Sequence, residues 1–107
     1  GNDGLRGYPL RQLRENLIAM IELSEAAGAK ALVLPMEIPP NLGKLYIDAF
    51  RDTFTQAAEQ TGAVLADFPL ASVALEPGLM QADGIHPTAA AQPRILDAVW
   101  SSLEGLL

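Results

Sequence analysis

Two short apolar runs, each set between helix-like segments, constrain the fold of this chain more than any other feature. They lie at residues 29–34 and 63–66, and neither alternates apolar with polar residues. A continuous apolar run of this length is typical of a strand covered on both faces, as in a parallel sheet. Strands that alternate with helices form βαβ units with right-handed crossovers. The sequence therefore predicts an α/β fold built on a parallel sheet.

Three segments with helical character flank these runs. The spacing of apolar residues predicts helices over residues 9–27 and 44–61, and a last helix from near Pro87 or Thr88 to about Leu103. Pro9 suits a first helical turn, and glycines follow the first two helices at the positions where a helix commonly ends. The predicted order is helix, strand, helix, strand, helix.

The two loops after the apolar runs are where a ligand is expected. Three prolines among residues 35–40 exclude a helix or a central strand there, so residues 35–43 are predicted to be loop. Residues 67–86 follow the second run and are also predicted to be mostly loop. In open α/β folds, ligands bind beyond the carboxyl ends of the strands, and both loops begin at such ends.

Two strands alone leave unpaired edges and do not make a stable sheet. The chain also opens on a turn sequence, Gly1-Asn2-Asp3-Gly4, where a Met, a targeting segment or a polar tail is usual. We therefore expect residues 1–107 to be the C-terminal part of a single, longer domain.

Composition excludes several classes of function. A net charge of −6, with only seven scattered Lys and Arg residues, argues against a nucleic-acid partner. The absence of cysteine excludes disulfides and thiolate chemistry. No apolar run approaches the roughly 20 residues that span a bilayer, so no membrane span is expected. With one histidine and carboxylates that lack ligand spacing, no metal and no cofactor are predicted; Asp48 and Asp52 are interpreted as a solvated helix face.

The stretch Asp83-Gly84-Ile85-His86-Pro87 holds the only histidine of the chain. A carboxylate three residues before an imidazole can fold back onto Nδ1, which orients the ring and leaves Nε2 as a general base. A surface turn followed by a helix start explains the same residues. A serine hydrolase also needs a nucleophile, and no serine of the chain lies in the tight glycine-flanked turn that exposes one; the candidates are Ser24, Ser72, Ser101 and Ser102.

The opening Gly1-Asn2-Asp3 turn is the second candidate. An Asn side-chain amide at the end of a strand can donate to a developing oxyanion, although the same three residues also make an ordinary turn.

Taken together, Gly1-Asn2-Asp3 and Asp83-Gly84-Ile85-His86-Pro87 resemble the SGNH hydrolase superfamily, whose members are also called GDSL esterases. That superfamily has a Gly-x-Asn-Asp block and a C-terminal Asp-x-x-His block. The segments Leu13-Arg14-Glu15-Asn16-Leu17 and Ile38-Pro39-Pro40-Asn41-Leu42-Gly43 look like the bacterial group of acyl-CoA thioesterase I, lysophospholipase and arylesterase. The resemblance covers essentially the whole chain.

The resemblance implies a flavodoxin-like, three-layer α/β/α fold with a five-stranded parallel sheet, of which this chain supplies the C-terminal strands and helices. It implies hydrolysis of a small-molecule ester or thioester through an acyl-enzyme. It assigns His86 as the general base, Asp83 as the residue that orients it and Asn2 as an oxyanion donor. It also places a mobile loop at residues 3–8 and the acyl groove against residues 36–43. The substrate contacts expected there are Asp3, Gly4, Leu5, Met36, Ile38 and Pro39.

The nucleophilic Ser of the superfamily lies in a Gly-Asp-Ser block that this chain lacks. A missing N-terminal segment or a companion chain is expected to supply it. A periplasmic or secreted location is what the resembling group suggests. The alternative is a non-catalytic flavodoxin-like module that binds an acyl ligand or a partner.

Overall fold

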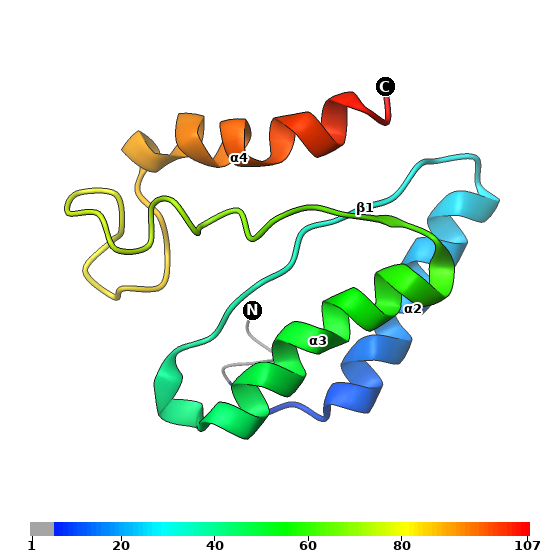
Figure 1. Ribbon diagram of the computed structural model, residues 1–107, viewed down its shortest axis with the longest axis horizontal. Coiled ribbons are helices and arrows are strands. Elements are labelled where there is room, and N and C mark those ends of the chain that lie inside the picture. The colour runs from blue at the N-terminus through cyan, green and yellow to red at the C-terminus, as the bar shows by residue number, and fades with distance from the viewer. Residues whose placement is uncertain (1–5) are drawn as a thin grey trace.

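The computed structural model describes residues 6–107. Its elements run in the order α2 (Leu10–Ala26), β1 (Leu32–Val33), the 3-10 turn η1 (Pro40–Leu42), α3 (Lys44–Thr61), β2 (Val64–Leu65), the 3-10 turn η2 (Ala89–Ala91) and α4 (Gln92–Glu104). This order confirms the predicted alternation of helices and strands. In Figure 1 the strand region runs between α4 on one side and α2 with α3 on the other, which gives a layered α/β arrangement.

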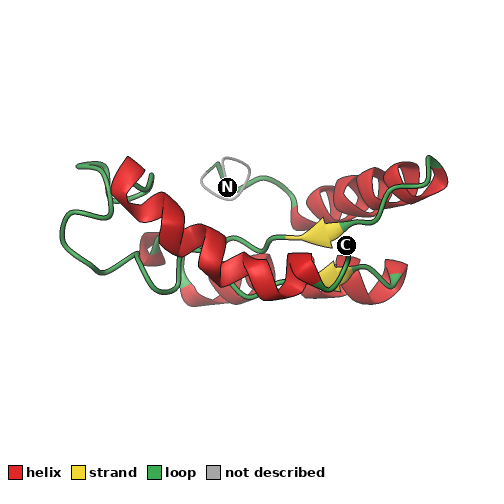
Figure 2. Cartoon of the chain, turned by 90° about the horizontal axis from the view of Figure 1, so that it is seen from above, coloured by secondary structure: helices red, strands yellow, loops and turns green. Residues whose placement is uncertain are grey.

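The two strands pair in parallel, as predicted, with Leu32 opposite Val64 and Val33 opposite Leu65 (Figure 2). The Ala66 N–H extends the ladder by donating to the Val33 carbonyl at 2.9 Å. Both strands are shorter than the apolar runs that predicted them. Among residues 6–107 each strand pairs only with the other, so the described part of the sheet has two strands.

Burial of the strand region differs from the expectation of cover on both faces. The side chain of Val33 is buried, but Leu34 is 44% exposed and Val64 is 37% exposed. Within the described chain, α2 and α3 cover the core side of β1, and the apolar side chains that point elsewhere remain accessible. The two apolar runs therefore predicted the strands correctly, but burial of both faces was confirmed only in part.

The core lies between α2, α3 and β1. Phe50 of α3 is fully buried and meets Phe54 edge to face, with ring centroids 5.3 Å apart. Leu13 and Ile21 of α2 complete this cluster from the opposite helix. Ile38 belongs to the same cluster, so the loop after β1 is anchored in the core before η1 begins. This contact positions one wall of the site described below.

The end of α3 is set by a glycine in the local sequence, as predicted. Gly62 ends α3 in the left-handed conformation, with φ of 75°, and its N–H donates to the Ala58 carbonyl at 2.8 Å. The last helix, in contrast, begins later than predicted, at Gln92. Pro87 forms an antiparallel bridge with Met80, and the backbone of Thr88 is extended. The pairing of Pro87 with Met80 therefore prevents the helix from starting at these two residues.

Candidate catalytic dyad and adjoining pocket

A narrow hairpin-like loop presents Asp83 and His86. The Gln81 N–H donates to the His86 carbonyl at 2.7 Å, and the Thr88 N–H donates to the Leu79 carbonyl at 2.9 Å. These bonds flank the Met80–Pro87 bridge and close the base of the loop. Gly84 turns the chain at the tip with φ of 69°, a conformation that glycine adopts without strain.

The two oxygens of the Asp83 carboxylate make different contacts. Oδ1 accepts the backbone N–H groups of Ile85 at 2.9 Å and of His86 at 3.0 Å, which holds the turn closed. Oδ2 lies 2.6 Å from Nδ1 of the His86 imidazole. An ionised carboxylate only accepts, so Nδ1 carries the proton and Nε2 is left as the basic nitrogen. The arrangement is the one that a general base and its orienting carboxylate require.

This geometry lowers the pKa of the Asp83 carboxyl. The hydrogen bond from the His86 side chain, followed by those from the backbone N–H groups of His86 and Ile85, lowers it from an ordinary 3.8 to about 2. Each of these donors stabilises the ionised form. Asp83 therefore stays charged throughout the neutral pH range.

The lowered pKa of Asp83 predicts an acid titration that NMR can measure. The carboxyl carbon of Asp83 should titrate with a midpoint near pH 2, below the ordinary 3.8. Since the folded-state pKa is the lower one, the stability that this contact contributes is present above pH 3.8 and is lost as the pH falls toward 2. A midpoint for Asp83 at its ordinary value would show that the dyad does not form in solution.

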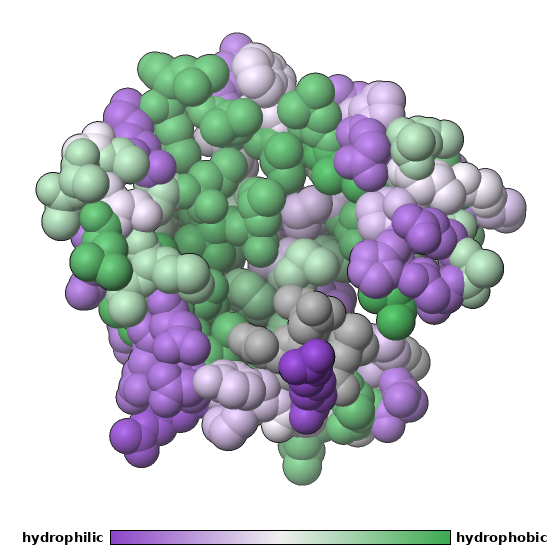
Figure 3. Space-filling view, turned by 180° about the vertical axis from the view of Figure 1, so that it is seen from behind, coloured by the Kyte–Doolittle hydropathy of each residue, from purple (hydrophilic) through white to green (hydrophobic). Residues whose placement is uncertain are grey.

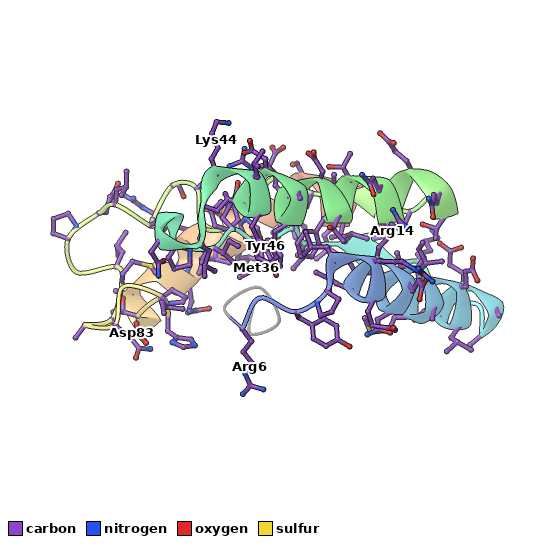
Figure 4. The ribbon with its side chains drawn as sticks, turned by 90° about the horizontal axis from the view of Figure 1, so that it is seen from below. Arg6, Arg14, Met36, Lys44, Tyr46 and Asp83 are labelled. Carbon is purple, nitrogen blue, oxygen red and sulfur yellow. The ribbon has the colours of Figure 1, made fainter. Side chains whose placement is uncertain are left out.

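An apolar pocket of about 300 Å³ lies beside the dyad. The three expected substrate contacts after β1, Met36, Ile38 and Pro39, all line it. Gly84 and Ile85, from the turn between Asp83 and His86, line it as well, so the pocket and the dyad share one loop. Figure 4 shows Met36 in the interior of the molecule, and Asp83 and Arg6 apart from each other along its lower edge.

For the second wall of this pocket, the sequence predicted the loop, residues 67–86, but not the residues that line it. This wall comes from the loop after β2, whose pocket-lining residues are Phe68, Leu70, Ala74, Leu75 and Met80. Leu75 is 97% exposed. The signal that could have identified these residues is the apolar character of the loop.

The other predicted residues stand as follows. Asn2, Asp3, Gly4 and Leu5 lie outside the described residues. Among residues 6–107, no hydrogen bond joins a serine to His86, and Ser24 instead donates to the Met20 carbonyl within α2.

The predicted solvated face of α3 carries ion pairs. The Asp48 carboxylate lies 2.7 Å from the Lys44 ammonium and 3.8 Å from the Arg51 guanidinium. Within residues 6–107 no three side chains are grouped so that they could hold a metal ion. None of the described helices is both long enough and apolar enough to span a membrane.

Known proteins with similar sequences are esterases and thioesterases. The chain is 49% identical over 107 residues to esterase TesA of Pseudomonas aeruginosa, and covers 53% of that protein. It is 36% identical over 107 residues to thioesterase 1/protease 1/lysophospholipase L1 of Escherichia coli strain K12, and covers 51% of it. The chain thus spans about half the length of the curated relatives it matches.

A solved structure has the same fold. The crystal structure of TesA superposes on this chain with a TM-score of 0.93 at 48% identity, over 99% of this chain and 59% of that one. The expected SGNH-type α/β fold is thereby confirmed for the part that this chain contains. The GDSL-like lipase/acylhydrolase family model matches residues 1–93, and the chain belongs to that family.

Proposed function

We propose that this chain, once joined by a polypeptide that carries a nucleophilic serine, hydrolyses carboxylic esters or acyl thioesters through an acyl-enzyme. The observation that carries the proposal is the 2.6 Å contact between Asp83 Oδ2 and His86 Nδ1, in a loop that also lines an apolar pocket. The first feature suits acid–base work on a hydroxyl, and the second suits an acyl chain.

The proposed reaction has two halves with His86 in both. His86 Nε2 takes the proton of the serine hydroxyl as the serine oxygen attacks the substrate carbonyl, and Asn2 donates to the resulting oxyanion. His86 then gives that proton to the departing alcohol or thiol, which leaves the acyl group on the serine. A water molecule, deprotonated by His86, attacks the acyl-enzyme. Release of the carboxylic acid returns the proton to the serine.

The serine is proposed to come from a segment or chain that bears the Gly-Asp-Ser block and packs against the strand region. This chain matches relatives of about twice its length, which supports such a partner. Large apolar side chains remain exposed on and beside the strands and along α4, and Figure 3 shows apolar residues gathered around a hollow on one face. Exposed apolar area of this kind marks an interaction surface. The exposed residues concerned are Leu34, Val64, Leu96 and Trp100.

The test is to mix this chain with a polypeptide carrying the first half of a family member, including its Gly-Asp-Ser block. We expect hydrolysis of p-nitrophenyl esters only when both are present. Acyl thioesters assayed alongside would show which leaving group is preferred. If a stable complex forms and neither oxygen esters nor thioesters are cleaved, the proposed function is wrong.

Asn2→Ala tests the proposed oxyanion donor. Loss of one such donor costs on the order of 10²-fold in kcat in a serine hydrolase, because the oxyanion exists only after attack. KM should change little. A matched Asn16→Ala variant, on the exposed side of α2, controls for the loss of an amide as such. Equal kcat values for Asn2→Ala and the parent would remove Asn2 from the mechanism.

Ala74→Trp tests whether the pocket holds the acyl chain. The residue is exposed and lines the pocket, so a bulky side chain there fills space without disturbing the core. Each methylene kept out of the pocket should lower kcat/KM about fourfold, from a transfer free energy of ~0.8 kcal/mol. Octanoyl esters should therefore lose far more than acetyl esters. Leu23→Trp, on the exposed face of α2, is the control, and an equal loss for both esters would argue against acyl binding here.

The alternative function, a non-catalytic module for an acyl ligand, draws on the same pocket. A pocket of about 300 Å³ can hold an acyl chain with no serine present. Calorimetry with octanoate, together with a hydrolysis assay of the completed protein, separates the two functions. Binding without any turnover would favour the module.

A further inference from the structure

Two ion pairs connect the two loops that line the pocket to two different helices. One loop follows β1 and supplies Met36, Ile38 and Pro39, and the other follows β2 and supplies Leu70, Ala74 and Leu75. Each loop contains one glutamate, and each glutamate pairs with an arginine of a neighbouring helix.

The first ion pair joins Glu37 to α3. Arg51 Nε lies 2.7 Å from Glu37 Oε1, and Glu37 lines the pocket together with its neighbours Met36 and Ile38. The other oxygen of Glu37, Oε2, is buried and has no hydrogen-bond partner among the described residues. A half-buried carboxylate of this kind depends on its one cation, so Arg51 is the group that keeps Glu37 in place.

The second ion pair joins Glu76 to α4. Arg94 Nη1 lies 2.5 Å from Glu76 Oε1, and the same nitrogen is 3.5 Å from the Ser72 carbonyl. These two contacts bracket residues 73–75, where Ala74 and Leu75 face the pocket. Arg94 therefore connects α4 to both sides of the segment that forms this wall.

We propose that the Arg51–Glu37 and Arg94–Glu76 pairs set the width of the pocket and thereby the acyl-chain selectivity of the site. The proposal rests on the proposed function, in which this pocket holds the acyl group. Arg51, Arg94 and Glu76 are positioning residues: they act on the substrate through the loops that they hold. Both pairs are partly exposed, so salt should weaken them.

Charge reversal is the sharpest test, because it replaces attraction by repulsion at an unchanged site. Arg51→Glu and Arg94→Glu should each raise KM for octanoyl esters about three- to tenfold, from the coupling energies typical of exposed pairs and the matching repulsion. The kcat for acetyl esters, which leave most of the pocket empty, should stay within about twofold. An unchanged ratio of octanoyl to acetyl kcat/KM would overturn the proposal.

Two further measurements separate positioning from a general loss of stability. The double variant Arg51→Glu with Glu37→Arg restores an ion pair of the opposite sense and should recover most of the octanoyl KM. Arg11→Glu breaks a comparable exposed pair with Glu15 on α2, outside the pocket, and should leave the acyl-length profile unchanged. If the double variant is no better than Arg51→Glu, or if Arg11→Glu has the same effect, the two pairs do not set selectivity.

Octanoate binding tests the ion pairs independently of catalysis. The Kd of octanoate, measured by calorimetry on the parent and on both charge-reversal variants, involves no serine. A three- to tenfold weaker Kd in the variants supports the proposal even if esters are not cleaved, in which case only the proposed function fails. An unchanged Kd in a protein that does cleave esters would overturn the ion-pair proposal alone.

Discussion

His86→Ala is expected to lower kcat for p-nitrophenyl ester hydrolysis about 10⁴-fold or more in the completed protein. The variant removes the group that accepts the serine proton in the first half of the reaction and the water proton in the second. No other histidine of the chain can replace it, because there is none. KM should change little, since the acyl pocket is built from other side chains.

The His86 side chain is largely exposed, so this variant should fold as the parent does. Circular dichroism and thermal unfolding on the two proteins would show that. Gln92→Ala, at the start of α4, is a matched control that removes an exposed polar side chain close by in the sequence. Activity of His86→Ala within a few-fold of the parent would rule out a base at this position.

Asp83→Asn should have the second largest effect, a loss of about 10²- to 10⁴-fold in kcat. Asparagine keeps one oxygen that can accept the N–H groups of Ile85 and His86, so the turn should survive. It replaces the acceptor of the Nδ1 proton by an amide that can donate. The imidazole is then driven to the tautomer with its proton on Nε2, where it cannot act as a base.

The pH profile distinguishes this effect from simple unfolding. Because the pKa of Asp83 is about 2, its carboxylate contributes equally across the neutral range, and the loss in Asp83→Asn should not diminish at higher pH. Asp97→Asn on α4 removes a carboxylate that does not contact His86 and should leave kcat within about twofold of the parent. If the two asparagine variants behave alike, Asp83 does not orient the base.

Local sequence was enough to predict most of the fold. Residues 44–61 were predicted as a helix with the bounds that α3 has, because Pro40 and Gly43 precede it and Gly62 ends it. The parallel pairing of two short apolar strands also followed from their pattern. The predicted start of the last helix, near Pro87 or Thr88, was wrong. The bridge between Met80 and Pro87 is a contact that helical periodicity cannot show.

The dyad and the two loops that form the pocket were predictable, but the pocket-lining residues of the second loop were not. Asp83 and His86 are three residues apart, so one tight turn brings their side chains together. The parallel pairing of β1 with β2 brings the loops that hold Met36 and Leu70 to one end of the sheet, as the apolar runs predicted. Loop residues lack the periodicity that shows which side chains of a helix or strand point inward, so the side chains of the second loop that line the pocket could not be predicted.

The central claim is that this chain provides the base, and a separate segment the nucleophile, of one ester-hydrolysing site. Intact mass spectrometry of the acyl-enzyme tests it most directly. This chain and the Gly-Asp-Ser polypeptide are mixed with p-nitrophenyl octanoate, the reaction is quenched in acid within the first turnover, and the mass of each polypeptide is measured. The mass of one octanoyl group should appear on the Gly-Asp-Ser polypeptide alone, and only when this chain with His86 intact is present. An octanoyl group on this chain, or equal acylation of the other polypeptide in its absence, would contradict the claim.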